Sequence, residues 1–201
     1  MSTLSAYKTA EREGYRRNLR AGLWMDGSFD WYREEDNISE NQGEIRSFSQ
    51  SYSKKEISFI KFTINNRSNA IITPKIVCHY ENAQERQAVA FYSPHEQAIL
   101  HVGQQSIALL GGVVRGRGIS QYCIQGKGSL YQHGCFKSLK EGLLLYSPLA
   151  RGEVTSIFSL ETEIMPQECI EAIAWVIHSA TKEEAKILHT DLLSQAASLA
   201  I

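Results

Sequence analysis

The stretch from Gln97 to Lys140 contains no Asp or Glu, although it carries five cations and several glycines. Backbone amides freed by glycine, together with guanidinium groups, are what proteins use to bind phosphates and carboxylates. Aromatic residues lie among these cations and could stack on a bound ring. The stretch therefore predicts a site for an anionic carbohydrate or a nucleic acid, formed by Arg115, Arg117, Tyr122, Lys127 and Tyr131.

A structural interpretation of the same stretch stays open. Its glycines are suited to hairpin turns, and its cations have acid-rich segments of the same chain, 26–44 and 153–171, as possible partners. A formal net charge of −1 favours such internal compensation and gives the whole molecule no attraction for polyanions.

A second group of cations lies at the N-terminus, where residues 1–25 are predicted to form a helix. Lys8, Arg12, Arg16 and Arg20 recur every fourth residue and would share one helix face. Aromatic residues follow closely, and such a large aromatic surface is normally covered. The segment predicts a solvated face or a partner-binding surface, and the residues for the latter are Arg12, Arg16, Arg20, Trp24 and Trp31.

Signatures of catalysis and metal binding are weak. His133 and Cys135 are the one close pair of metal-ligand types, and they supply at most two of the four ligands that zinc needs. Gly126-Lys127 is followed by Gly128, so no phosphate loop is formed, and no GxSxG elbow occurs. The sequence predicts no metal and no cofactor, and a small hydrolase using His133 and Cys135 is kept only as a further alternative.

The elements that must position these residues are short β-strands. Runs of β-branched and aromatic residues are separated by Gly, Pro and Asn, which is typical of a sandwich or barrel. A polar linker is expected at residues 37–53. Strands are expected near 57–64, 71–80, 87–92, 98–102, 105–110, 112–115, 119–125, 128–132, 143–147, 153–164 and 170–179. The last of these, an apolar run, could also be a short helix.

The C-terminus carries a clear helix signal. Thr181 with Glu184 three residues later forms a capping box, and an apolar stripe that includes Leu188 and Leu192 follows. This stripe is expected to pack on its own domain or, alternatively, to contact a second copy or a protein partner through Leu188 and Leu192.

The composition is that of an ordinary globular protein: 201 residues, 43% hydrophobic and 21% charged. No signal peptide or membrane-spanning segment is evident, and the four cysteines form no CxxC pair, so a cytoplasmic location is expected.

The fold class predicted from these patterns is mainly β. We expect an antiparallel β-sandwich, immunoglobulin-like or jelly-roll-like, over 51–180, with a helical, charged and aromatic arm at 1–50 and an amphipathic helix at 181–201. The favoured function is a non-catalytic interaction or structural protein that self-associates and binds a protein partner through its sheet loops. The alternatives are the anionic carbohydrate or nucleic acid module and the small hydrolase.

Overall fold

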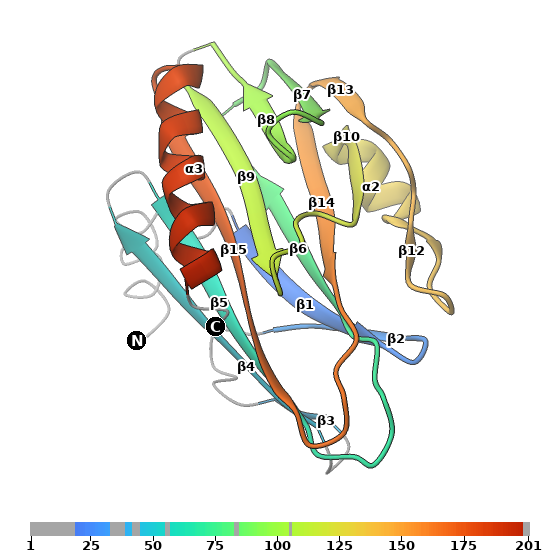
Figure 1. Ribbon diagram of the computed structural model, residues 1–201. Helices are drawn as coiled ribbons and strands as arrows, with labels where there is room; N and C mark the ends of the chain where they lie inside the picture. The colour runs from blue at the N-terminus through green and yellow to red at the C-terminus, as the bar shows by residue number, and fades with distance from the viewer. Residues whose placement is uncertain are drawn as a thin grey trace, which may run out of the picture.

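The protein consists mainly of two antiparallel sheets packed face to face, as the computed structural model in Figure 1 shows. The structure describes residues 19–32, 39–41, 45–54, 57–82, 85–104 and 106–198; side chains of the strands between 39 and 54 and of residues 197 and 198 lie outside this description. The expected mainly β, antiparallel architecture is confirmed.

The smaller sheet has five strands, in the spatial order β10-β14-β6-β1-β2. Each neighbouring pair is antiparallel, so residues far apart in the sequence face one another across the sheet. The strands are β10 (Gln121–Gly126), β14 (Val154–Glu161), β6 (Lys75–Glu81), β1 (Leu19–Met25) and β2 (Ser28–Trp31).

The larger sheet has eight strands, in the order β13-β7-β8-β9-β15-β5-β4-β3. Its centre is β15, the longest strand, which pairs with β9 on one side and β5 on the other. The strands are β13 (Leu149–Gly152), β7 (Ala88–Ser93), β8 (Ala98–Val102), β9 (Ile107–Val114), β15 (Cys169–Ser179), β5 (Ile57–Asn66), β4 (Ile45–Lys54) and β3 (Ser39–Asn41).

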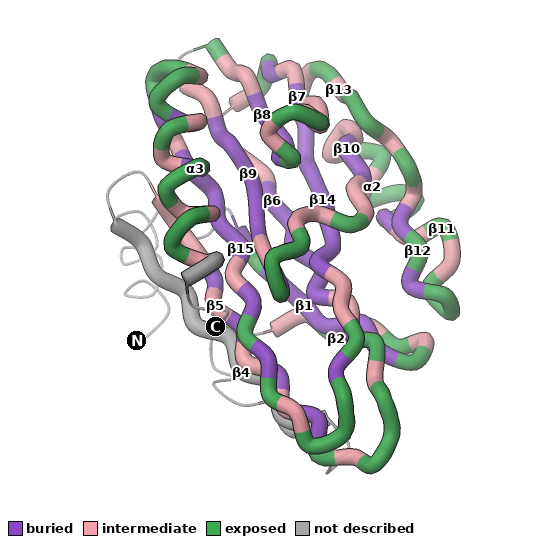
Figure 2. Tube along the Cα trace, viewed as in Figure 1, coloured by how far each residue is buried: buried purple, intermediate pink, exposed green. Residues whose placement is uncertain are grey.

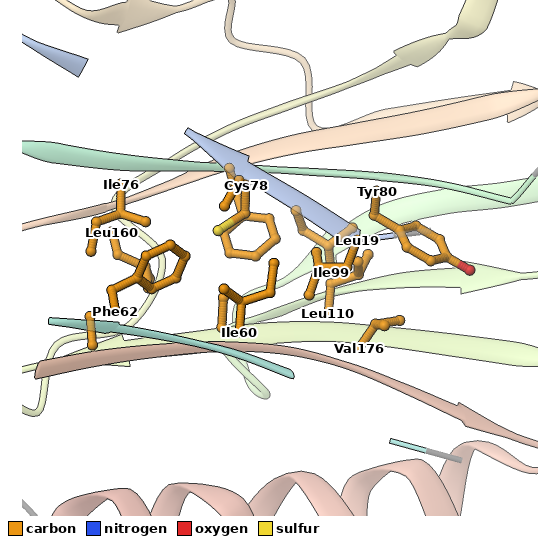
Figure 3. Close-up of a cluster of buried hydrophobic side chains, with 14 of the residues drawn as sticks. Leu19, Ile60, Phe62, Ile76, Cys78, Tyr80, Ile99, Leu110, Leu160 and Val176 are labelled. Atoms are coloured by element: carbon orange, nitrogen blue, oxygen red, sulfur yellow. The ribbon is translucent and has the colours of Figure 1, made fainter. Parts of the chain in front are cut away.

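The main core lies between the two sheets. Alternate residues of each strand point inward because successive side chains of a strand face opposite sides. Figure 3 shows this packing, with Phe62 and Ile60 of β5 opposite Ile76 and Cys78 of β6. All four of these side chains are buried, and the apolar area that they remove from water is the principal stabilising contribution.

Each sheet is also covered on its outer face. Helix α3 (Lys182–Ser198) lies across the larger sheet against β9 and β15, as Figure 1 shows, and its outward side is largely exposed in Figure 2. Helix α2 (Lys127–His133) and the hairpin of β11 (Phe136–Ser138) and β12 (Leu143–Leu144) accompany the smaller sheet. No helix in the described ranges is long and apolar enough to cross a bilayer.

The N-terminal helix is not supported. Residues 1–18, including Lys8, Arg12 and Arg16, lie outside the described residues, and residues 19–25 form strand β1 instead of the end of a helix. The four-residue spacing of the cations suggested a helix, but Leu19, Ala21 and Leu23 alternate with Arg20 and Gly22 and point into the core. Pairing on both sides, with β6 and β2, stabilises the extended conformation.

Three other expectations need correction. The linker expected at 37–53 is wrong, because β3 and β4 extend the larger sheet and β4 runs from Ile45 to Lys54, whereas the domain bounds at 50 and 180 stay predictions. Residues 128–132 form α2 rather than a strand, with Leu130 packed toward the smaller sheet. The two strands expected at 105–110 and 112–115 are one strand, β9, which continues through Gly111 and Gly112.

Two expectations for the C-terminal part of the chain, a strand at 170–179 and a helix after Thr181, are confirmed. Residues 169–179 form a strand with eight buried or nearly buried neighbours in register on β9, which explains their continuous apolar character. Helix α3 begins after Thr181, whose Oγ1 accepts a hydrogen bond from the backbone amide of Glu184 at 3.2 Å.

Candidate functional site

The five residues of the predicted ligand site lie in three separate places. Arg115 and Arg117 belong to the turn that follows β9, Tyr122 lies on β10, and Lys127 and Tyr131 lie on α2. The topology places these residues, which are close in sequence, on different elements: the turn after β9 of the larger sheet, the edge strand β10 of the smaller sheet, and α2. The carboxylate-free stretch is therefore not one surface.

The two arginines of the turn have different surroundings. Arg115 has a φ of 49° and pairs with Glu168, and both side chains are partly exposed. Glu168 belongs to the acid-rich segment 153–171, so the charge of Arg115 is compensated within the chain, as the structural interpretation of this stretch expects. Arg117 is exposed and lines an open cleft of about 590 Å³ together with Arg115.

Tyr122 forms part of an aromatic cluster at the edge of the sandwich. Its ring stacks on Tyr92, with centroids 4.1 Å apart and planes 12° apart, and tilts against Tyr146 at 5.5 Å. Burial, together with a hydrogen bond to Tyr146, raises the pKa of Tyr122 to about 12. Tyr122 and Tyr92 also pack against the core, so their ring faces serve the fold.

Lys127 and Tyr131 lie beside the end of β6, where they bond to Asn82 and Glu81. We call the surface formed by Arg20, Trp31, Glu81, Lys127 and Tyr131 the Arg20 surface. Arg20 is directly opposite His79 in the register of β1 and β6, and both side chains point to the outer side of the smaller sheet. The predicted partner-binding residues Arg20 and Trp31 are thus brought close to two residues of the predicted ligand site.

Arg20 is held in place by two contacts. Its Nε donates a hydrogen bond to His79 Nδ1 at 2.8 Å, and its guanidinium carbon lies 4.5 Å from the centre of the Trp31 ring. Among the described residues, Nε is the only atom of this guanidinium with a hydrogen-bond partner. Arg20 is exposed, so its terminal nitrogens can donate a two-pronged hydrogen bond to an anion.

The histidine beneath Arg20 has a defined protonation state. Thr155 donates its hydroxyl proton to Tyr80 O at 3.0 Å and therefore accepts from His79 Nε2 at 2.7 Å. His79 Nδ1 is consequently unprotonated and accepts from Arg20. Burial, with the nearby charges of Arg20 and Lys127, lowers the pKa of His79 from 6.5 to about 3. His79 is a neutral support for Arg20.

The remaining groups supply aromatic faces and an acceptor. Phe29 packs edge-on against Trp31, with centroids 4.7 Å apart. Tyr131 is 68% exposed and donates its hydroxyl proton to Glu81 Oε2 at 3.0 Å. Lys127 Nζ donates to the carbonyl of Asn82 at 3.0 Å. The Arg20 surface thus combines two cations, Arg20 and Lys127, with aromatic rings and one carboxylate.

The other predicted partner residues lie elsewhere. Trp24 is only 7% exposed and donates from Nε1 to Leu139 O at 2.6 Å, so it fastens the segment after β11 to the smaller sheet. Leu188 and Leu192 pack with Trp175 on the outer face of the larger sheet. Their stripe thus contacts its own domain, the first of the two arrangements expected for it.

Groups that could act as nucleophiles or bases are mostly buried. Cys135 is 7% exposed, and burial raises the pKa of its thiol to about 11, so it is protonated at neutral pH. His101 is buried, and its pKa is lowered to about 3. In the described ranges, no three His, Cys, Asp or Glu side chains gather as a metal-ligand group.

The sequence interpretation missed His79, Glu81 and Thr155. A weak signal was present, because His79 and Glu81 alternate with the apolar residues Cys78 and Tyr80 in a β-strand. Polar residues at every second position mark the outward side of a strand. Their partners could not be inferred, because β1, β6 and β14 pair across long stretches of chain.

Comparison with known proteins gives only distant likenesses to solved structures. No protein family and no curated protein matches the chain. Among solved structures, a polysaccharide lyase matches with 10% identity and a TM-score of 0.45, over 86% of this chain and 27% of that one. An inverting mannosidase of family GH92 from Bacteroides thetaiotaomicron matches with 9% identity and a TM-score of 0.42, over 90% and 25%. The chain spans about a quarter of the length of these structures, and neither likeness bears on what it binds.

Proposed function

We propose that this protein is a non-catalytic binding module that holds an anionic carbohydrate at the Arg20 surface. The observation that carries the proposal is the exposed guanidinium of Arg20, fixed by His79 Nδ1 at 2.8 Å and by the ring of Trp31. Fixing a long side chain before the ligand arrives lowers the entropy lost on binding. A planar guanidinium fixed in this way matches the geometry of a carboxylate.

The mixed character of the Arg20 surface favours a sugar over a nucleic acid. Glu81 and Tyr131 can exchange hydrogen bonds with hydroxyl groups, and Glu81 would repel a continuous phosphate backbone. Tyr131, which is exposed, offers an aromatic face to the apolar side of a sugar ring. A sugar acid, which has many hydroxyl groups and one carboxylate, fits this combination.

A binding role without catalysis is supported by the state of the titratable groups. His79 and His101 are buried and held neutral, and their pKa values of about 3 are far from the range of a general base at neutral pH. The pKa of Cys123 and that of Cys135 are each raised to about 11. The cytoplasmic location, the self-association and the protein partner expected from the sequence stay predictions, and the packing of α3 on its own sheet does not favour that helix as the contact.

The test is calorimetric titration of the full chain with oligogalacturonate and, separately, with a neutral galactose oligomer. We expect the acidic oligomer alone to bind, and its affinity to fall as the salt concentration rises. Replacing Arg20 by Gln removes a charge-assisted pair of hydrogen bonds, each worth about 1.5–3 kcal/mol, so affinity should fall at least about tenfold.

Two further variants separate recognition from general charge. Arg20→Lys keeps the charge but removes the planar fork, and it should bind nearly as weakly as Arg20→Gln. Arg151→Gln, at an exposed position on β13, should bind like the unchanged protein. Equal binding of the neutral oligomer, an equal loss in Arg151→Gln, or tighter binding of single-stranded DNA would each refute the proposal.

A further inference from the structure

A second polar feature, separate from the Arg20 surface, is the open cleft beside the turn after β9. Its volume of about 590 Å³ lies within the range of small-molecule sites, which is about 300–1,000 Å³. The charged groups that line it come from both sheets: Arg115 and Arg117 follow β9, Lys75 begins β6, and Glu161 and Glu163 lie at and beyond the end of β14.

Three of these five charges are already used within the protein. Lys75 Nζ donates to Glu141 O at 3.1 Å and Gly142 O at 3.0 Å, and it lies 3.7 Å from Glu161 Oε2. Glu161 Oε1 accepts from Gln121 at 2.5 Å and from Ser159 at 2.6 Å. Arg115 pairs with Glu168. The charges of these three groups are therefore balanced by partners within the protein.

One positive and one negative side chain remain. Both Arg117 and Glu163 are exposed, and within the described part of the chain neither side chain has a hydrogen-bond or ion-pair partner. Among the described residues no ion pair joins them to each other, although both line the same cleft. The lining therefore presents one positive and one negative side chain that are both available to a ligand.

The backbones that carry these two groups are well fixed. Arg117 and Val114 exchange two backbone hydrogen bonds of 2.9 Å across a tight turn whose left-handed residues are Arg115 and Gly116. Glu163 precedes Ile164, which exchanges two backbone hydrogen bonds with Ile72. The two charges thus stand on defined backbone positions, which is what selective recognition requires.

We propose that this cleft binds a small dipolar molecule that carries both a carboxylate and an ammonium group. The carboxylate lies against Arg117, and the ammonium group lies against Glu163. A ligand with only one of these charges satisfies one partner and leaves the other unpaired, so the cleft selects for both. The proposal does not depend on the Arg20 surface, which uses other residues.

The test is an NMR titration of the full, isotope-labelled chain with three matched probes. Glycylglycine carries both charges, N-acetylglycine carries only the carboxylate, and glycinamide carries only the ammonium group. We expect glycylglycine to shift the backbone amides of residues 115–117 and 161–163, with a millimolar dissociation constant. Each singly charged probe should bind at least about fivefold more weakly, the effect of one exposed charge pair.

Four variants complete the test. Arg117→Gln should weaken glycylglycine binding about fivefold and leave glycinamide unaffected, whereas Glu163→Gln should weaken glycylglycine and leave N-acetylglycine unaffected. Arg151→Gln and Glu183→Gln, at exposed positions on β13 and α3, are the charge-matched controls. Equal affinities for the three probes, shifts away from the two segments, or no shifts at all would overturn the proposal.

Discussion

Lowering the pH from about 7 to about 5 is expected to destabilise the folded protein strongly, because two buried histidines must stay neutral in the fold. His79 is 2% exposed and bonded to Thr155, and His101 is 5% exposed and bonded through Nε2 to Ser156 Oγ at 2.7 Å. The hydrogen bond between His101 on β8 and Ser156 on β14 joins the two sheets. Burial is the main reason why the pKa of each histidine falls from 6.5 to about 3.

The sign and size of the effect follow from proton linkage. Below pH 6.5 the unfolded chain takes up a proton at each of these histidines and the folded chain does not, so acid favours unfolding. Below pH 6.5, each histidine lowers the free energy of unfolding by about 1.4 kcal/mol per pH unit. At pH 5 the loss is about 2 kcal/mol for one histidine and about 4 kcal/mol for the pair. Burial also lowers the pKa of His178 and His189, which act in the same direction.

The assay is urea unfolding followed by tryptophan fluorescence at several pH values between about 5 and 7, where carboxylates contribute little. The free energy of unfolding should fall by at least about 4 kcal/mol across this range. In His101→Gln, whose amide can still bond Ser156, the fall should be smaller by about 2 kcal/mol. A total change below about 1 kcal/mol would refute the assignment of neutral, buried histidines.

Three further predictions concern packing, surface charge and thiols. Gly111→Ala would place a methyl group 2.7 Å from Trp175 Nε1 beneath α3, so unfolding free energy measured by urea titration should fall by about 1–3 kcal/mol. Arg115→Gln breaks a half-exposed pair with Glu168 and should change that free energy by less than about 1 kcal/mol. In the folded protein only Cys169 of the four cysteines is exposed, so a thiol reagent should modify one thiol per chain until denaturant is added.

Each of these three predictions has its own control or contrary result. Gly128→Ala is the matched control for the glycine, since nothing lies within 4 Å of the added methyl group there. Equal effects at the two glycines would contradict the close approach of α3. A large loss in Arg115→Gln would mean that the pair contributes more than its exposure allows, and rapid reaction of a second thiol would contradict the burial of the other three.

The strands that could be predicted were those whose local pattern agrees with their surroundings. β5 and β14 carry β-branched and aromatic residues in or near alternation, and each forms close to where it was expected. The helix α3 was predictable for a similar reason, because its cap and its apolar stripe lie within one stretch of chain. Such signals depend on neighbours in the sequence alone.

The errors lie where distant contacts decide the conformation. Arg20 is the last of four cations at helical spacing, yet hydrogen bonds to β6, more than fifty residues later, hold residues 19–25 in a strand. Gly111 and Gly112 suggested a break, but β15 and α3 require small residues at that point of β9. In both places the cost of a poor local preference is smaller than the gain from tertiary packing.

A mainly β protein with a capped C-terminal helix could be predicted from local patterns of residues, and so could the chemical interest of Arg20, Trp31, Lys127 and Tyr131. That these four residues lie on one surface, and that Arg115, Arg117 and Tyr122 do not, depends on how the strands pair and pack. Periodicity encodes which side of a strand a residue occupies, whereas strand order is set by the burial of whole sheet faces. A binding surface built across β1, β2, β6 and α2 exists only once that order is established.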